Sequence, residues 1–218
     1  MNALCWLLPW ALAACTPPVS SPSQQKPTLP KPPAVTATTT PAGIPQTALQ
    51  FRRPLIQAWQ FYFAMGQPAA IGFAQIHQES RWNPNATSPV GARGLSQFMP
   101  GTADWIDTLL PADQRCSDPA GCATDPRWAI NAMTRFDWWL WEQNAGAATD
   151  MDRWGKSLAG YNGGQGWVQR ESAKALNPAV WWDSVELVCL RSAAACAETR
   201  DYVRKIWNKW RPLYLTWG

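Results

Sequence analysis

The chain has 218 residues, with 19 lysines and arginines against 15 acidic residues and a formal charge of +4. So small a positive excess argues against a nucleic-acid-binding protein, which gathers basic residues on one face. Tryptophan is unusually frequent, with 16 residues. Its flat amphipathic ring fills cores and also suits the apolar faces of sugars.

Residues 1–15 predict a lipoprotein-type signal peptide. The first fourteen residues carry no charge and are mostly apolar, and the run is too short to span a bilayer as a mature helix. It ends in Leu12-Ala-Ala-Cys15, which resembles a bacterial lipobox and would make Cys15 a lipid-modified first residue. The usual basic residue before the apolar run is missing. An ordinary cleaved signal with an incidental cysteine is the alternative.

Residues 16–47 predict a disordered linker. The segment is rich in Pro, Ser and Thr, and its only charged residues are Lys26 and Lys31. With almost no large apolar side chains it cannot bury enough surface to fold. Proline favours an extended, semi-stiff spacer, which could hold a domain away from a membrane. A tail without any tethering role is the alternative.

Residues 48–218 are enough for one domain with a substantial core. Apolar side chains recur at helical spacing, and no stretch alternates convincingly with period two, so an all-α fold is expected. Thr102 is the expected N-cap of the third helix. The predicted helices cover residues 46–65, 69–82, 102–110, 125–144, 152–161, 166–175 and 198–210.

Four cysteines lie in this domain as two close pairs, Cys116 with Cys122 and Cys189 with Cys196. Secretion would permit disulfides, and three connectivities exist. The two local pairings are favoured. A zinc site is less favoured, because the only histidine, His77, lies far away in the sequence and the cysteine spacings are not of the metal-binding kind.

One carboxylic acid, Glu79, falls near the end of the second predicted helix. It follows Ile76 by three positions and so borders the buried face of that helix. Partial burial disfavours the carboxylate and raises its pKa, which a general acid at neutral pH requires. From helix position alone, a solvated carboxylate paired with Arg81 or Arg93 is the better interpretation. His77, two residues away, is expected at the surface or its boundary.

A set of motifs in fixed order favours the catalytic interpretation of Glu79. Together the motifs resemble the soluble lytic transglycosylase family with its goose-type-lysozyme-like domain. Any one motif would be weak, whereas the ordered set is highly specific. The motifs are Glu79-Ser80, Gly94-Leu-Ser-Gln97, Met99-Pro-Gly-Thr-Ala103, Ala159-Gly-Tyr-Asn-Gly-Gly164 and Glu198-Thr-Arg-Asp-Tyr-Val203.

The resemblance implies a lysozyme-like helical domain that cleaves the β-1,4 bond between N-acetylmuramic acid and N-acetylglucosamine in peptidoglycan. Glu79 is then the single catalytic acid and base, and a 1,6-anhydro sugar is the product. No cofactor or metal is implied. Enzymes in which the substrate supplies the second group are a recognised exception to the two-carboxylate rule.

The resemblance also assigns supporting residues. Ser88 matches a serine that contacts the sugar N-acetyl group, and Tyr202 a tyrosine that orients the catalytic glutamate. The other matches are substrate-binding positions at Gln97, Met99, Tyr161, Asn162 and Glu198. The chain departs from the family pattern at Ser96, where methionine is usual, and at Gly160 and Gly163, which loosen the turn.

The expected partners are peptidoglycan glycan strands, the membrane through the lipid anchor, and an envelope-spanning machinery; no nucleic acid is expected. The expected location is the periplasm, anchored to the outer membrane. Two other functions stay open. A lysozyme-like hydrolase would use the same fold and add water, and a non-catalytic wall-binding or assembly module would bind glycan without cutting it.

Overall fold

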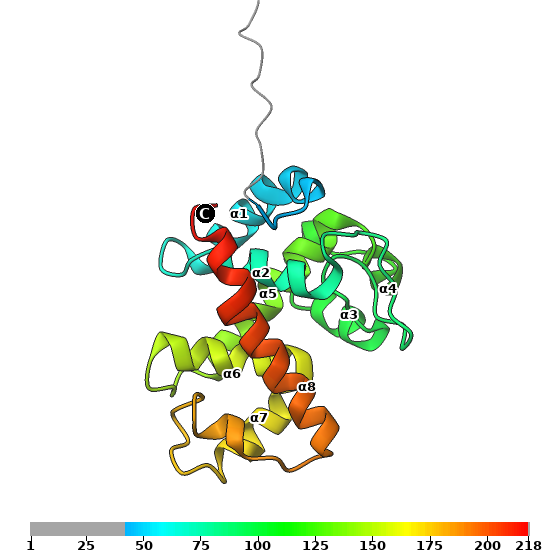
Figure 1. Ribbon diagram of the computed structural model, residues 1–218. Coiled ribbons are helices and arrows are strands. Elements are labelled where there is room, and N and C mark those ends of the chain that lie inside the picture. The colour runs from blue at the N-terminus through cyan, green and yellow to red at the C-terminus, as the bar shows by residue number, and fades with distance from the viewer. Residues whose placement is uncertain (1–41, 218) are drawn as a thin grey trace, which may run out of the picture. The chain divides into compact units, whose positions relative to one another are not determined.

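The computed structural model describes residues 42–217, and helices dominate this part of the chain (Figure 1). Within residues 42–217 there is no β-strand, only isolated bridges that join Thr87 to Arg93 and Arg93 to Phe98. The all-α expectation is confirmed. The α-helices are α1 (Leu49–Phe63), α2 (Ala70–Ser80), α3 (Pro100–Asp107), α4 (Pro119–Cys122), α5 (Pro126–Gln143), α6 (Asp150–Gly163), α7 (Gln165–Ser172) and α8 (Ala193–Arg204).

Short helical turns complete the fold. Four are 3-10 helices, at η1 (Gln46–Ala48), η2 (Ala112–Gln114), η3 (Val185–Leu187) and η5 (Arg211–Tyr214). The fifth, η4 (Lys205–Trp210), is a π-helix that continues α8.

The predicted signal peptide, its Cys15 and most of the predicted linker lie outside the described residues. At the other end of that linker, Ile44 is buried in the core and residues 46–48 already form η1. Packing of the domain therefore includes residues 44–47, a few positions before the boundary expected from composition.

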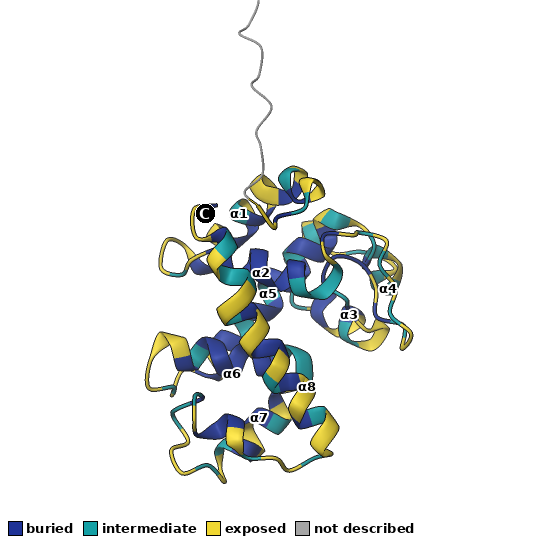
Figure 2. Cartoon of the chain, viewed as in Figure 1, coloured by how far each residue is buried: buried dark blue, intermediate teal, exposed yellow. Residues whose placement is uncertain are grey.

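Helix α2 lies at the centre of the domain. Its residues 70–77 are all buried, and it packs against α1, η4 and η5 (Figure 2). Gly72 permits the contact with α1, since a Cβ there would lie 2.6 Å from the ring of Trp59. A helix enclosed in this way cannot show the simple amphipathic stripe of a surface helix.

Helix α5 begins and ends close to where the sequence predicts. The Asp125 side chain accepts from the backbone N–H groups of Arg127 and Trp128, and Pro126 occupies the first helical position. The helix packs between α1 and α6. Tryptophans fill much of the space around it: Trp141 contacts Trp154, whose ring also stacks on Trp59.

Two helix starts differ from the prediction. Helix α3 begins at Pro100 with Met99 as N-cap, and Thr102 lies within its first turn and makes no cap bond. Proline at the first helical position is pre-organised for a helix, which explains the earlier start. Helix α8 begins at Ala193, five residues before the expected Glu198, because Ser192 caps it by accepting from the N–H of Ala195.

Two disulfides, Cys116–Cys122 and Cys189–Cys196, close small loops in the structure, which are the local pairings favoured from the sequence. The second anchors the start of α8, because Cys196 lies inside that helix. Across the described part of the chain, no group of His, Cys, Asp and Glu side chains is arranged to hold a metal ion. Nor does any helix there have the length and apolarity to cross a bilayer.

Candidate functional site

Glu79 lies in the last turn of α2, just before Arg81 and Trp82 end the helix with left-handed backbone angles. Its side chain is partly buried. The Tyr202 hydroxyl of α8 donates to Glu79 Oε1 at 2.5 Å, although the two residues are 123 positions apart. The contact that the resemblance implied for Tyr202 is therefore present, while the catalytic roles of both residues stay a proposal.

The pKa of Glu79 is raised to about 8, chiefly by burial, with the hydrogen bond from Tyr202 acting in the opposite direction. Among residues 42–217 neither Arg81 nor Arg93 forms an ion pair with it. The carboxyl is therefore neutral at pH 7 and is not the solvated, arginine-paired carboxylate that helix position alone favoured.

Another acid, Asp137 of α5, is fully buried close to Glu79 and was not predicted from the sequence. Gln75, one helical turn before Glu79, donates from Nε2 to Asp137 Oδ1 at 3.2 Å. Burial raises the pKa of Asp137 well above its usual range, and the nearby charge of Glu79 raises it further. Only the contact between α2 and α5, which are distant in sequence, reveals this acid.

The two buried oxygens left over, Asp137 Oδ2 and Gln75 Oε1, have no hydrogen-bond partner among the described residues. An ionised Asp137 would leave both as unsatisfied acceptors, which is costly in the interior. A protonated Asp137 carries one O–H that can donate, and an amide and a carboxylic acid can pair through two hydrogen bonds. The chemistry of the pair thus agrees with a neutral Asp137.

The loop that carries Gln97 is fixed against Ala123, which directly follows the Cys116–Cys122 disulfide loop. Gly94 has a φ of +77°, and a Cβ there would lie 1.6 Å from the carbonyl oxygen of Ala123, so only glycine fits. Gln97 itself is left-handed, at φ 49°. Its Nε2 donates to the carbonyls of Gly94 and Ala86, which leaves Oε1, rather than the whole amide, to face a ligand.

Ser88 and Tyr161 each form a hydrogen bond with the backbone of residues 92–96. The Ser88 hydroxyl accepts from the backbone N–H of Ala92 at 2.9 Å. The Tyr161 hydroxyl of α6 donates to the carbonyl of Ser96 at 2.8 Å. Ser96, where the family usually has methionine, is fully buried and donates to Ala129 O, so the change from the family pattern affects the interior.

The remaining predicted positions differ in their setting. Asn162 accepts from Thr199 at 2.8 Å, which joins α6 to α8. Glu198 is exposed and lies one turn before Tyr202, on the same face of α8. Met99 is 42% exposed at the start of α3. The structure thus brings Glu79 and Tyr202 into direct contact, and the substrate roles of the other residues stay predictions.

His77 is buried, so its expected surface position is wrong. Its Nδ1 lies 2.8 Å from the Tyr214 hydroxyl, and its ring stacks on Trp210 at 4.1 Å. Burial, followed by the charges of Arg81 and Lys209, lowers its pKa to about 4. The covering residues lie more than 130 positions later in the chain, beyond the reach of a local pattern.

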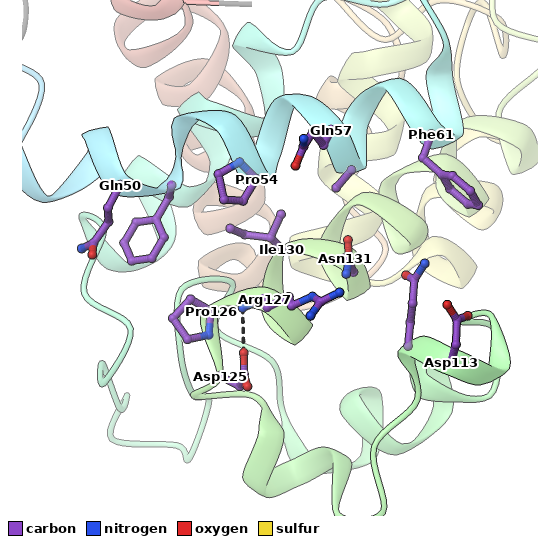
Figure 3. A pocket seen from close by; sticks show the side chains of 13 residues that line it. Gln50, Pro54, Gln57, Phe61, Asp113, Asp125, Pro126, Arg127, Ile130 and Asn131 are labelled. Atoms are coloured by element: carbon purple, nitrogen blue, oxygen red, sulfur yellow. Dashed lines mark hydrogen bonds between the residues drawn. The ribbon is translucent and has the colours of Figure 1, made fainter. Parts of the chain in front are cut away.

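A large pocket, of about 620 Å³, lies elsewhere (Figure 3). It is formed between α1 and the start of α5, and Gln57, Arg127 and Asn131 are among its lining side chains. None of the predicted site residues lines it. The pocket is therefore separate from Glu79 and Tyr202.

Comparisons with known proteins agree with this geometry. The family described as transglycosylase SLT domain matches residues 64–181. The chain is 31% identical over 139 residues to the soluble lytic murein transglycosylase of Escherichia coli K12, covering 64% of this chain and 19% of that protein. It is 34% identical over 114 residues to the membrane-bound lytic murein transglycosylase F of Pasteurella multocida, covering 50% and 21%.

Among solved structures, the crystal structure of the 70 kDa soluble lytic transglycosylase of Escherichia coli matches with a TM-score of 0.51 and 27% identity. The match covers 74% of this chain and 23% of that one. The chain spans about a fifth of the length of the curated relatives named above.

The helical fold, which matches that of the Escherichia coli enzyme, defines a lysozyme-like domain. More than half of the chain matches one family, so the chain belongs to the family of transglycosylase SLT domains. Residues 198–203, with Tyr202, lie beyond the matched range. The hydrogen bond from Tyr202 to Glu79 is therefore an independent point of agreement with the motif order.

Proposed function

We propose that the chain is a lytic transglycosylase that cleaves peptidoglycan between N-acetylmuramic acid and N-acetylglucosamine and leaves a 1,6-anhydro end on the muramic acid. The observation that carries the proposal is the carboxyl of Glu79, which accepts from the Tyr202 hydroxyl at the end of a buried helix, where burial raises its pKa to about 8. A general acid must hold a proton at working pH, and this one does. The names of the relatives in the same family support the substrate class.

The reaction needs no second ionised carboxylate. Glu79 donates its proton to the bridging oxygen as the bond to the muramic acid carbon breaks. The substrate's own N-acetyl oxygen stabilises the electron-poor carbon. The ionised Glu79 then takes the proton of the muramic acid 6-hydroxyl, whose oxygen forms the new bond to that carbon. The proton returns to Glu79, and no water is consumed.

The test is release of soluble fragments from purified cell-wall sacculi, analysed by mass. The wild-type protein should release anhydro-muropeptides. Glu79→Gln should lower the rate by about 10²–10⁴, the usual contribution of general acid–base catalysis, while keeping the wild-type circular dichroism spectrum. Full activity of Glu79→Gln would remove the assignment.

The same digest separates the alternatives. A hydrolase yields products heavier by one water, because water replaces the 6-hydroxyl as nucleophile. A non-catalytic wall-binding module would sediment with sacculi and release nothing. Either result would contradict the transglycosylase proposal.

For the whole chain we propose a periplasmic enzyme anchored to the outer membrane through a lipid on Cys15. The support is the apolar run and lipobox-like end of residues 1–15, followed by the proline-rich residues 16–47. Cys15→Ser in the full chain should move the protein from the membrane fraction to the soluble one. An unchanged membrane fraction would contradict lipid anchoring at this residue.

A further inference from the structure

A continuous run of aromatic rings begins at Tyr161, whose hydroxyl donates to the loop that carries Gln97. Tyr161 of α6 contacts Phe136 of α5, with ring centroids 5.1 Å apart. Phe136 contacts Trp105 of α3 at 5.4 Å and Trp139 of α5 at 6.0 Å. Three helices thus bring together rings that the sequence places 56 positions apart, from Trp105 to Tyr161.

The outer end of this run is open to solvent. Trp105 is 37% exposed and Trp139 is partly exposed, whereas Phe136 between them and Tyr161 is buried. The two tryptophans meet edge to face, with centroids 5.0 Å apart and planes at 80°. This pair, Trp105 with Trp139, is called the tryptophan platform below.

The indole N–H groups of the platform are also free. Among the described residues neither Trp105 nor Trp139 donates a hydrogen bond to the protein, whereas the buried Trp82, Trp128 and Trp154 all donate to a polar side chain. Most buried tryptophans satisfy the N–H inside the protein, and Trp181, whose Nε1 is buried without a partner among the described residues, is an exception. The platform keeps both ring surface and donors available to a ligand.

We propose that the tryptophan platform binds a sugar ring of the glycan strand, outside the two sugars that react at Glu79. This inference rests on the proposed function for its substrate class. A pyranose ring offers an apolar face to an indole and hydroxyl groups to its N–H, which matches what the platform leaves free. Gln143, exposed one turn after Trp139, adds an amide that can donate and accept at the rim.

The position of the platform selects a glycan over other occupants. Trp105 is two ring contacts, of 5.4 and 5.1 Å, from Tyr161, whose hydroxyl donates to Ser96 O in the Gln97 loop, so the platform lies within reach of a polymer bound beside that loop. Two partly exposed rings are also far smaller than the ~800 Å² per partner of a standard protein–protein interface.

The experiment uses Glu79→Gln in the full chain, so that the ligand is bound without turnover. Calorimetry measures the dissociation constant for a soluble β-1,4-linked hexamer of N-acetylglucosamine. Trp105→Leu keeps apolar packing on Phe136 but removes the flat ring, and Trp105→Phe keeps a smaller ring. The matched control is Trp207→Leu, since Trp207 is also partly exposed and paired with a tryptophan, Trp182, at 6.1 Å.

Trp105→Leu should weaken binding about tenfold, as expected when an anchoring tryptophan is lost, and Trp105→Phe should recover part of this loss. Trp207→Leu should leave the affinity unchanged. Equal affinity for all variants, or no binding of the hexamer, would overturn the platform. The sacculus digest tests the proposed function separately. If the wild-type protein released no anhydro product, the proposed function would fail, and the effect of Trp105→Leu on hexamer binding would still decide whether the platform binds sugar.

Discussion

At the scale of single residues, the site depends on keeping a carboxyl group neutral at a pH where carboxyls ordinarily ionise. Burial raises the pKa of Glu79 to about 8, and the Tyr202 hydroxyl limits the rise by stabilising the carboxylate. Tyr202 therefore has two effects: it fixes the direction of the acid, and it keeps the proton transferable. The pKa of an acid near working pH is what efficient proton transfer in both directions requires.

Replacing Tyr202 with phenylalanine separates these effects. Loss of the hydrogen bond should raise the pKa of Glu79 further, so the alkaline limb of the kcat/KM profile should move from about pH 8 to higher pH. Turnover at the optimum should fall about ten- to a hundredfold, because the acid is no longer oriented. A profile of initial rates against pH measures both. An unchanged limb, or one displaced to lower pH, would contradict the role of this bond.

The raised pKa of Asp137 leads to a prediction about how the folding stability depends on pH. Its pKa lies well above the ordinary 3.8, so folding favours the protonated form. The stability it contributes is complete below about pH 4 and is lost as pH rises toward the folded-state pKa. Asp137→Asn keeps the partner of Gln75 without an ionisable group. It should become more stable than wild type as pH rises from 4 to 7, by at most about 1.4 kcal/mol per pH unit.

Urea unfolding at several pH values, read by fluorescence, measures this difference. Asp137→Leu is the control, because it removes the acid but leaves the buried Gln75 amide unpaired and should destabilise at every pH. If the stability of Asp137→Asn relative to wild type stayed constant or fell as pH rises from 4 to 7, Asp137 would be an ionised residue, against the neutral pair described above.

At the scale of elements, local sequence patterns largely predict the helices of the domain. They do not predict the contacts between helices that are distant in the sequence. Asp125-Pro126 and the apolar spacing predict α5 because capping and periodicity are local. The starts of α3 and α8 were wrong by two and five residues, because the prediction overlooked Pro100 and Ser192. The burial of Asp137 and His77 was missed because the segments that cover them lie far away in sequence.

Gly94 provides the test at this scale. An added Cβ would meet the Ala123 carbonyl at 1.6 Å, and φ is +77°. Gly91 is the matched control, because its φ is +91° and a Cβ added there would have no other atom within 4 Å. Gly91→Ala should cost about 1 kcal/mol from backbone strain alone. Gly94→Ala should cost about 2 kcal/mol more, since the loop must move.

The displaced loop carries Gln97, so Gly94→Ala should also lower release of muropeptides from sacculi, and Gly91→Ala should not. Chemical denaturation and the digest assay check the two effects together. Equal stability of the two variants would mean that the contact between this loop and Ala123 is not tight.

At the scale of the whole molecule, the C-terminal residues close over the helix that holds the acid. Tyr214 of η5 is fully buried; its hydroxyl accepts from Trp82 Nε1 and lies 2.8 Å from His77 Nδ1. Because the pKa of His77 is lowered to about 4, the ring is neutral and Nδ1 can accept from Tyr214. The stability that this group contributes is present above about pH 6.5 and is lost as pH falls through 4.

Tyr214→Phe should therefore destabilise the domain by about 2–5 kcal/mol, because two buried groups lose their partner. Tyr62→Phe is the control. The Tyr62 hydroxyl is buried without a hydrogen-bond partner among the described residues, so its removal should be neutral or stabilising. Thermal and urea unfolding compare the two variants. A loss for Tyr62→Phe as large as that for Tyr214→Phe would contradict the bonding scheme.

The enclosure of α2 also determines how the protein opens. Residues 70–77 of α2 are buried, so their backbone amides should reach solvent only when the whole domain unfolds. In heavy water these amides should be among the slowest to exchange in residues 42–217. On warming, we expect the proposed activity to persist up to the global melting transition, because Glu79 directly follows this protected segment in the same helix.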